Sequence, residues 1–292
     1  MEHILVTGAN GQLGSEIRKH SALFPNLKFV FTDVDTLDIT DFKTLDHFIT
    51  SNGIGMTINC AAYTNVDKAE SDSRKAYLIN AEAVKHLADL SIKYKMPIIH
   101  VSTDYVFDGK SEIPYKETDA TEPNTEYGKS KLQGELNLKS SHKSIIIRTS
   151  WLYSSFGNNF VKTIMRLAQE REELKVVNDQ IGSPTYAEDF AKTLVQITDL
   201  CQRSPQKFIP GIYHYSNEGQ CSWYEFAREI ISLTRSKCRL IPVTSSEFPS
   251  AAKRPSYSLL DKSKFKSTYD IEIPHWKESL SKCLKEIDGS KV

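Results

Sequence analysis

Three glycines near the N-terminus constrain the fold more than any other feature of this sequence. Gly8, Gly11 and Gly14 follow a short apolar run at residues 4–6 and precede an amphipathic stretch at residues 12–23. Glycines at this spacing let the backbone turn tightly and approach a pyrophosphate, and a helix N-terminus offers free N–H groups with a partial positive charge. Glycines also mark ordinary turns, but a position directly after a first strand favours a dinucleotide-binding α/β fold.

Short apolar runs alternate with longer helical patterns through the first half of the chain. We predict strands at residues 4–6, 29–31, 56–59, 98–101 and 145–148, and helices at residues 12–23, 42–50, 74–94 and 127–138. Continuous apolar strands separated by helices are typical of a parallel sheet that is covered on both faces. The fold class is therefore predicted to be α/β, with a doubly wound, Rossmann-like parallel sheet.

The alternation changes after residue 149. We predict helices at residues 160–170, 187–200, 222–234 and 276–287, and strands at residues 175–177 and 211–216, in a region that prolines interrupt repeatedly. The dinucleotide-binding domain is assigned to residues 1–150, and residues 181–218 are expected to return to it. Residues 151–180 and 219–292 are assigned to a smaller C-terminal substrate-binding domain.

Asp33 ends the second predicted strand, 25 residues after Gly8. An acidic residue at this point can accept hydrogen bonds from both ribose hydroxyls of NAD. Residues 34–39 contain no Arg or Lys to meet a 2′-phosphate, so NADH is modestly favoured over NADPH. A turn aspartate without a ligand is the alternative. The small residues Ala61 and Ala62 follow the third strand and would let a cofactor lie across the sheet edge, unless they only serve helix–sheet packing.

Tyr127 and Lys131 stand four residues apart at the start of a predicted helix, so they share one helix face. A lysine ammonium beside a tyrosine is expected to lower the phenol pKa and make the tyrosine a usable acid. The alternative is that both side chains lie on a solvated helix face and take no part in catalysis. Ser102 and Thr103 follow the fourth strand, where a hydroxyl can polarise a substrate carbonyl or merely cap a turn.

Together these features resemble the extended short-chain dehydrogenase/reductases, in which an Asn often stands where Asn80 does here. The segments 63–70, 101–109 and 179–185, with Arg254-Pro255, further resemble the dTDP-4-dehydrorhamnose reductases, and this similarity extends to about residue 290. The resemblance implies NAD(P)H-dependent reduction of the C4 keto group of dTDP-4-dehydro-L-rhamnose to dTDP-L-rhamnose.

The resemblance also implies roles for single residues. Tyr127 would protonate the C4 alkoxide, Lys131 would hold the nicotinamide ribose, and Thr103 would bind the reacting oxygen. Asp104 and Trp151 would contact the sugar, and Arg254 the nucleotide or diphosphate. The implied cofactor-binding residues are Gly8, Gly11, Gln12, Leu13, Gly14, Asp33, Asp38, Ile39, Ala61, Ala62, Tyr63, Tyr127 and Lys131. Some relatives use a Mg²⁺-bridged homodimer, but no residue of this sequence can be assigned to a metal.

Composition limits the remaining partners. Lys plus Arg and Asp plus Glu both number 37, so no surplus of basic residues points to nucleic acid. Five scattered cysteines without a C-x-x-C motif are expected to be reduced thiols. No stretch has the length of a membrane span, and no signal peptide is expected, so a cytoplasmic protein is predicted.

Three alternatives remain open beside the reductase. A related 4,6-dehydratase would need a carboxylic acid at the position of Tyr105, which makes it the weakest rival. A 4-epimerase would retain its nicotinamide through each cycle and copurify with it. A non-catalytic NADP-binding regulatory subunit, of the methionine adenosyltransferase type, would have no chemical need for Thr103, Tyr127 and Lys131.

Overall fold

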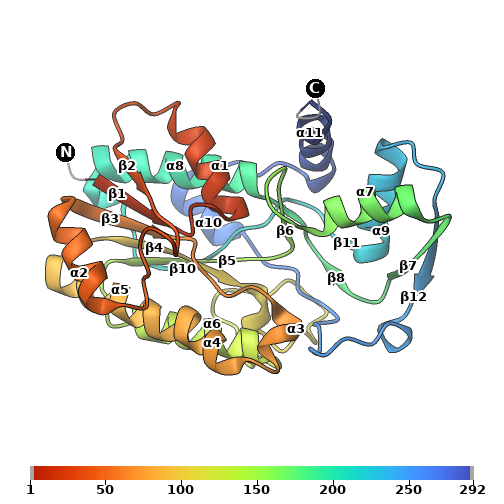
Figure 1. Cartoon of the computed structure of the whole chain (residues 1–292), viewed down its shortest axis with the longest axis horizontal. Coiled ribbons are helices and arrows are strands. Elements are labelled where there is room, and N and C mark those ends of the chain that lie inside the picture. The colour runs from red at the N-terminus through yellow and green to blue at the C-terminus, as the bar shows by residue number, and fades with distance from the viewer. Residues whose placement is uncertain (1–2, 290–292) are drawn as a thin grey trace.

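A parallel β-sheet forms the centre of the computed structural model, which describes residues 3–289 (Figure 1). Within that range the sheet has six strands in the order β10-β5-β4-β3-β1-β2, and all neighbouring pairs are parallel. They are β1 (His3–Thr7), β2 (Phe29–Phe31), β3 (Ile54–Asn59), β4 (Ile98–Thr103), β5 (Ser144–Thr149) and β10 (Gly211–His214). The strand order reverses between β1 and β3, which opens a crevice at their carboxyl ends. The predicted doubly wound sheet is confirmed.

Both faces of the sheet are buried, and alternate residues of one strand enter different cores. Ile4 and Val6 of β1 pack in the core that α1 and α8 cover, whereas Leu5 packs under α2 and α5. One face is covered by α1 (Gln12–Ser21), α8 (Ala187–Arg203) and α10 (Ser263–Tyr269), and the other by α2 (Phe42–Ser51), α5 (Ala83–Tyr94) and α6 (Glu126–Leu138). This double coverage explains why the strands are continuously apolar.

The helix predicted over residues 74–94 is interrupted. It consists of α4 (Ser73–Tyr77), a π-helical turn η1 (Leu78–Glu82) and α5, and a short α3 (Val66–Ala69) precedes it. Asn80 lies in the π turn, where its Oδ1 accepts from the Tyr63 N–H at 2.9 Å and its Nδ2 donates to Ser130 at 3.0 Å. The widened turn therefore ties the segment after β3 to α6.

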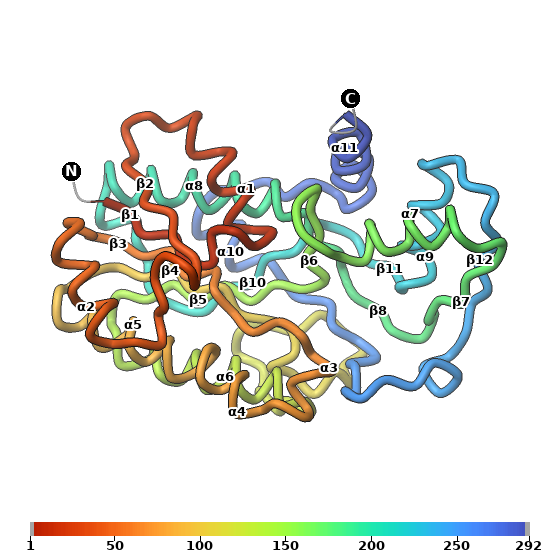
Figure 2. Tube along the Cα trace, in the orientation of Figure 1, coloured from red at the N-terminus to blue at the C-terminus, as the bar shows by residue number. Residues whose placement is uncertain are grey.

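A second core lies beyond the sheet, toward the right of Figure 2. Phe226 and Trp276 are at its centre. It is built from α7 (Phe160–Glu170), β7 (Glu173–Val177), α9 (Trp223–Leu233), β12 (Arg239–Val243) and α11 (Trp276–Gly289), with the short pairs β6 (Leu152–Tyr153)–β9 (Thr185–Tyr186) and β8 (Ile181–Gly182)–β11 (Cys221–Ser222) beside it. The remaining turns are η2 (Asp104–Val106), η3 (Pro205–Lys207) and η4 (Ser245–Glu247).

The division into two domains stays a prediction, and two observations bear on it. Strand β10 and helix α8 belong to the sheet and its core, within the segment 181–218 that was expected to return there. Phe265 of α10 also packs in the sheet core, although it lies in the segment 219–292. In the part of the chain that the structure describes, no helix is both long and apolar enough to cross a membrane.

Candidate active site

A cleft of about 1010 Å³ opens at the carboxyl ends of β1, β3 and β4. Its far wall comes from residues 149–152 and 157–159, which lead toward the second core. Fifteen of the predicted site residues line it: Gly8, Gly11, Gln12, Leu13, Gly14, Asp33, Asp38, Ile39, Ala61, Ala62, Thr103, Asp104, Tyr127, Lys131 and Trp151. The cleft therefore brings together the glycine turn, the small residues after β3 and the Tyr–Lys pair.

The glycine turn is shaped for close approach. Gly8 has φ +64°, and a Cβ there would lie 2.7 Å from the backbone nitrogen of Ala61. Gly11 is the N-cap residue of α1 and has no side chain to accept from the helix. The first N–H groups of the helix therefore remain available to an anion. At the end of β2, Asp33 accepts a hydrogen bond from the Asn10 N–H at 2.8 Å. These residues fit the diphosphate and one ribose of a dinucleotide.

Thr103 and Tyr127 meet from neighbouring elements. Thr103 ends β4, and Tyr127 lies in the first turn of α6, which Thr125 caps by accepting from the Gly128 N–H at 3.0 Å. The Thr103 side chain lies near the Tyr127 phenol, while its own hydroxyl donates to Asp104 Oδ1 at 3.0 Å. Burial raises the pKa of Tyr127, and the nearby Thr103 hydroxyl offsets part of that rise. A neutral phenol in contact with a hydroxyl is suited to donate a proton.

The predicted effect of Lys131 on the tyrosine is wrong for this structure. The groups that shift the Tyr127 pKa besides burial are Thr103, Asp104 and Tyr105. Lys131 instead donates to the Val101 carbonyl at 2.7 Å. Burial lowers the pKa of Lys131 to about 8, so the amine is mostly protonated at pH 7 and loses its charge as the pH rises through 8.

Asp104 is a buried acid on the wall of the cleft. Its Oδ1 accepts from the Thr103 hydroxyl at 3.0 Å. Its Oδ2 has no partner with hydrogen-bond geometry among the described residues, although the Ser258 hydroxyl is near enough to lower the Asp104 pKa. Burial raises the pKa of Asp104 to about 6. An unpartnered buried oxygen is costly unless a ligand satisfies it, which suits Asp104 to a polar group of a bound molecule.

Trp151 enters the cleft from an unusual backbone conformation. Its φ is +48°, which is rare and strained for a bulky residue. The indole of Trp223 stacks on it with ring centroids 3.6 Å apart and planes 9° apart. Trp223 was missed in the sequence because it lies 72 positions away from its partner. Of the pair, Trp151 lines the cleft, and its flat apolar ring is suited to the face of a sugar ring.

Two predicted site residues lie outside the cleft lining. Tyr63 has its backbone N–H bound to Asn80, and its ring packs near Tyr105. Arg254 forms a salt bridge with Asp67 at 2.7 Å and reaches the hydroxyl of Tyr105 at 3.3 Å. Tyr105 lines the cleft, so Arg254 contacts a residue of the cleft lining without lining the cleft itself.

The whole chain matches a known family. Residues 1–288 match the family model described as the RmlD substrate binding domain. The dTDP-4-dehydrorhamnose reductase of Aggregatibacter actinomycetemcomitans is 42% identical over 288 residues, which cover 96% of this chain and 97% of that protein. The chain belongs to the dTDP-4-dehydrorhamnose reductase family.

Solved structures with the same family name agree with this assignment. The Clostridium acetobutylicum dTDP-4-dehydrorhamnose reductase aligns with a TM-score of 0.92 at 42% identity, covering 98% of this chain and 99% of that one. The Bacillus anthracis dTDP-4-dehydrorhamnose reductase, determined in complex with NADP, gives 0.90 at 41% identity with the same coverage. The fold is thus that of a dTDP-4-dehydrorhamnose reductase.

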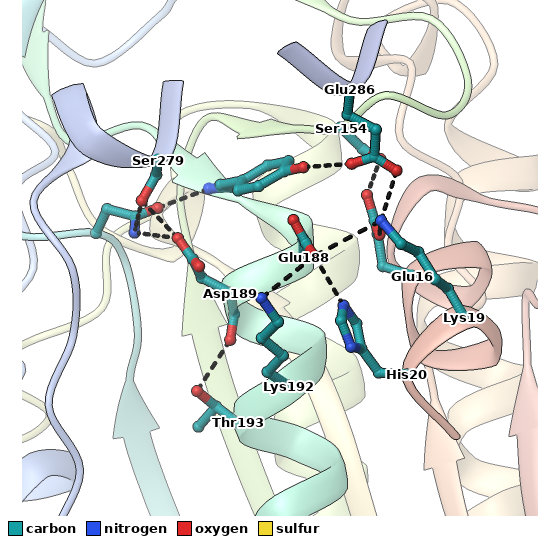
Figure 3. Close-up of polar contacts among 12 residues, drawn as sticks. Glu16, Lys19, His20, Ser154, Glu188, Asp189, Lys192, Thr193, Ser279 and Glu286 are labelled. Carbon is teal, nitrogen blue, oxygen red and sulfur yellow. Dashed lines mark hydrogen bonds and ion pairs between the residues drawn. The ribbon is translucent and has the colours of Figure 1, made fainter. Parts of the chain in front are cut away.

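The Mg²⁺ that some dTDP-4-dehydrorhamnose reductases use does not fit the residues here. Within residues 3–289 no group of three or more His, Cys, Asp or Glu side chains is arranged to hold a metal ion. Glu16, Glu188 and Glu286 do converge, but the ammonium of Lys19 lies among them (Figure 3). Its Nζ is 4.0, 3.6 and 2.5 Å from their respective oxygens. Lys192 Nζ is also 3.2 Å from Glu188, so two lysines already meet these carboxylates.

Proposed function

We propose that the chain catalyses NAD(P)H-dependent reduction of the C4 keto group of dTDP-4-dehydro-L-rhamnose to dTDP-L-rhamnose. The observation that carries this proposal is the convergence of Thr103, Tyr127 and Lys131 in one cleft with the glycine turn. Membership of the family, over nearly the full length of the chain, supplies the substrate.

The chain's own residues handle the proton and the geometry. A bound nicotinamide cofactor supplies the hydride. Thr103 binds the C4 oxygen, and Tyr127 donates its phenolic proton to that oxygen as negative charge develops on it. Lys131 binds the hydroxyls of the nicotinamide ribose and supports reprotonation of Tyr127. Burial of all three side chains keeps water from competing for these hydrogen bonds.

Substrate recognition is proposed for the far wall. The Trp151 indole packs on the sugar face, and the free Oδ2 of Asp104 binds a sugar hydroxyl. Arg254 acts on the diphosphate only if it leaves Asp67, because its guanidinium is already paired. Exchange of the Asp67 carboxylate for a diphosphate is electrostatically reasonable, since both are anions that match the guanidinium.

The cofactor cradle is proposed to be the predicted set of residues that line the cleft, from Gly8 to Ala62, together with Tyr127 and Lys131. Asp33 and the lack of a basic residue in 34–39 favour NADH. The NADP complex of the Bacillus anthracis relative supports acceptance of the phosphorylated form. Residues 1–150 and 181–218 are proposed as the dinucleotide-binding domain, and the remainder as the substrate-binding domain.

The proposal extends to location and assembly. The five cysteines, all in the described range, form no disulfide, which supports the reducing cytoplasm. A homodimer is proposed from the resemblance, without the bridging Mg²⁺, because the ammonium groups of Lys19 and Lys192 already contact the converging carboxylates of Glu16, Glu188 and Glu286.

The decisive experiment follows NADH and NADPH oxidation with a panel of dTDP-4-keto sugars and identifies the product by NMR. We expect turnover with dTDP-4-dehydro-L-rhamnose. Tyr127→Phe should lower kcat by roughly 10²–10⁴-fold, the usual scale for a lost general acid, and leave dinucleotide affinity nearly unchanged. Near-normal turnover in this variant would refute the role of Tyr127.

The rival functions give other results in the same experiment. An epimerase would convert a nucleotide sugar without net oxidation of added NADH and would carry bound nicotinamide through purification. A regulatory subunit would bind NADP, retain a partner enzyme and reduce none of the keto sugars. The buried contact between Thr103 and Tyr127 disfavours this second rival, since an idle site has no need of it.

A further inference from the structure

A chain of buried polar side chains reaches the Lys131 amine from β1, β3 and β4. The Thr7 hydroxyl donates to Asn59 Oδ1 at 2.6 Å, Asn59 Nδ2 lies 2.9 Å from His100 Nδ1, and His100 Nε2 lies 3.3 Å from Lys131 Nζ. All four side chains belong to residues that are at most 2% exposed. Buried polar chains of this kind have few alternative partners, so the direction of each hydrogen bond can be worked out.

The Ala61 backbone fixes the orientation of the Asn59 amide. The Ala61 N–H can only donate, and it lies 3.2 Å from Asn59 Oδ1, which also receives the Thr7 hydroxyl. The Asn59 nitrogen must therefore face His100. Because an amide nitrogen only donates, His100 Nδ1 accepts and carries no proton. Burial holds the pKa of His100 well below its usual range, so the ring is neutral and its single proton is on Nε2.

That N–H is directed at Lys131. A lysine ammonium has three donors and no acceptor, whereas the neutral amine has a lone pair that can accept. A charged Lys131 would therefore place two donors opposite each other across 3.3 Å. The Val101 carbonyl at 2.7 Å accepts from Nζ in either state and does not distinguish them.

The other ionisable groups near Lys131 offer little compensation. The Glu135 carboxylate is held by Arg148 through two hydrogen bonds of 2.9 and 2.7 Å. Burial raises the pKa of Cys60 to about 12, so its thiol is neutral. Tyr127 is neutral for the same reason. The burial that lowers the Lys131 pKa to about 8 acts in the same direction as the histidine N–H.

We propose that His100 is a positioning residue for Lys131: in a tautomer that Asn59 fixes, it presents Nε2–H to the lysine amine and weakens the hold of the lysine on its proton in the free protein. Lys131 then holds its proton more firmly when ribose hydroxyl oxygens offer it new acceptors. The lysine is a switchable group rather than a fixed positive charge. The catalytic meaning of this switch rests on the proposed function, but the tautomer and the charge do not.

The first test reads the tautomer directly in the unmodified protein. NMR of the ¹⁵N-histidine-labelled chain, with His100 assigned by its loss in His100→Leu, should show an unprotonated Nδ1 and a protonated Nε2 from pH 6 to 9. A protonated Nδ1 at any pH in this range would overturn the proposal. This measurement requires no turnover, so its failure leaves the reductase assignment untouched.

The second test changes the tautomer of His100, so that the ring proton lies on Nδ1 instead of Nε2. In Asn59→Asp one oxygen still accepts from Thr7 and Ala61, and the other accepts from His100 Nδ1–H, so Nε2 becomes an acceptor for a Lys131 ammonium. The acid dissociation constant of Lys131, followed by ¹³Cε-lysine NMR and assigned with Lys131→Met, should fall at least tenfold, or about one pKa unit.

The matched control is Asn59→Asp in a His100→Leu background. There the added charge remains, but the imidazole between position 59 and Lys131 is missing. We expect a clearly smaller shift there. Equal shifts in both backgrounds would show a direct charge effect and exclude the role of His100. In the single variant, the basic limb of the kcat/KM profile, which reports the free protein, should move to higher pH together with the Lys131 titration.

Discussion

At the residue scale, burial favours the neutral form of each ionisable group at the reacting end of the cleft. It raises the pKa values of Asp104 and Tyr127 and lowers that of Lys131. Asp104, with a pKa of about 6, and Lys131, with a pKa of about 8, can each change charge close to neutral pH, whereas Tyr127 stays a neutral phenol, so each group can exchange a proton with a ligand at little electrostatic cost. The site is therefore prepared for proton transfer before any ligand arrives.

Ionised Asp104 should lower the free energy of unfolding at neutral pH. Its pKa is about 6 in the folded chain and 3.8 in a model compound, so the folded state binds more protons between these values. Stability is then fullest below pH 3.8 and falls as pH rises through 6. We predict that Asp104→Asn is more stable than the wild type at pH 7.5, by up to about 3 kcal/mol, and has a lower kcat/KM for the keto sugar.

Thermal unfolding at pH 7.5 and at pH 4 checks this prediction. The variant's Tm should exceed that of the wild type at the higher pH, and the difference should shrink at the lower pH, where Asp104 is largely protonated. A Tm difference that does not depend on pH would mean that Asp104 is ionised without penalty in the folded chain.

The predicted positions of Thr103, Tyr127 and Lys131 followed from simple periodicity. Strand ends of a parallel sheet meet at one edge, and residues four apart share a helix face. The role of His100 could not be predicted in this way. The chain of polar groups to which it belongs spans β1, β3 and β4 and ends on α6, and only the register of those strands places the groups in line.

At the element scale, the close contact of α6 with the π turn η1 depends on Gly134. A Cβ at this position would lie 2.2 Å from the carbonyl oxygen of Asn80. In an ordinary helix Gly→Ala stabilises by about 1 kcal/mol. Here we predict that Gly134→Ala destabilises the protein by about 1–3 kcal/mol, because α6 must move away from η1.

Thermal unfolding monitored by circular dichroism measures this effect, and Gln133→Ala is the control. Gln133 is the exposed neighbour on the same helix and bonds only to Asn137 at 3.0 Å. Its replacement should leave Tm nearly unchanged. Equal unfolding temperatures in the two variants would show that α6 does not need a glycine at position 134 to pack against η1.

The elements that the sequence did not predict have physical reasons. A π turn adds one residue to a helix without altering its composition, so residues 74–94 have the pattern of a single helix. Strand β12 contains Pro242, which argues against a central strand, but β12 pairs only with β7 and its proline needs no ladder partner on the open side. Helix α10 has 7 residues, too few for a helical period to stand out.

At the scale of the whole molecule, the sheet and the second core are joined beside the cleft. Ser154 follows β6 and donates to the buried carboxylate of Glu16 on α1 at 2.6 Å. The same hydroxyl accepts from the Phe156 N–H at 2.9 Å, and Asn159 donates to Gln12 at 3.0 Å. Helix α1 begins at the glycine turn, so these contacts hold the 157–159 wall against the proposed diphosphate site.

Ser154→Ala should therefore weaken dinucleotide binding without touching the ligand. We predict an increase in Kd for NADH and NADPH of about 3- to 10-fold, the equivalent of one lost hydrogen bond of about 1 kcal/mol, measured by isothermal titration calorimetry. Ser267→Ala is the matched control, because that hydroxyl binds only the Lys264 carbonyl on α10 at 3.1 Å. If both variants bind the dinucleotides as the wild type does, the wall is positioned by the remaining contacts, and Glu16 serves the folded state rather than the cofactor site.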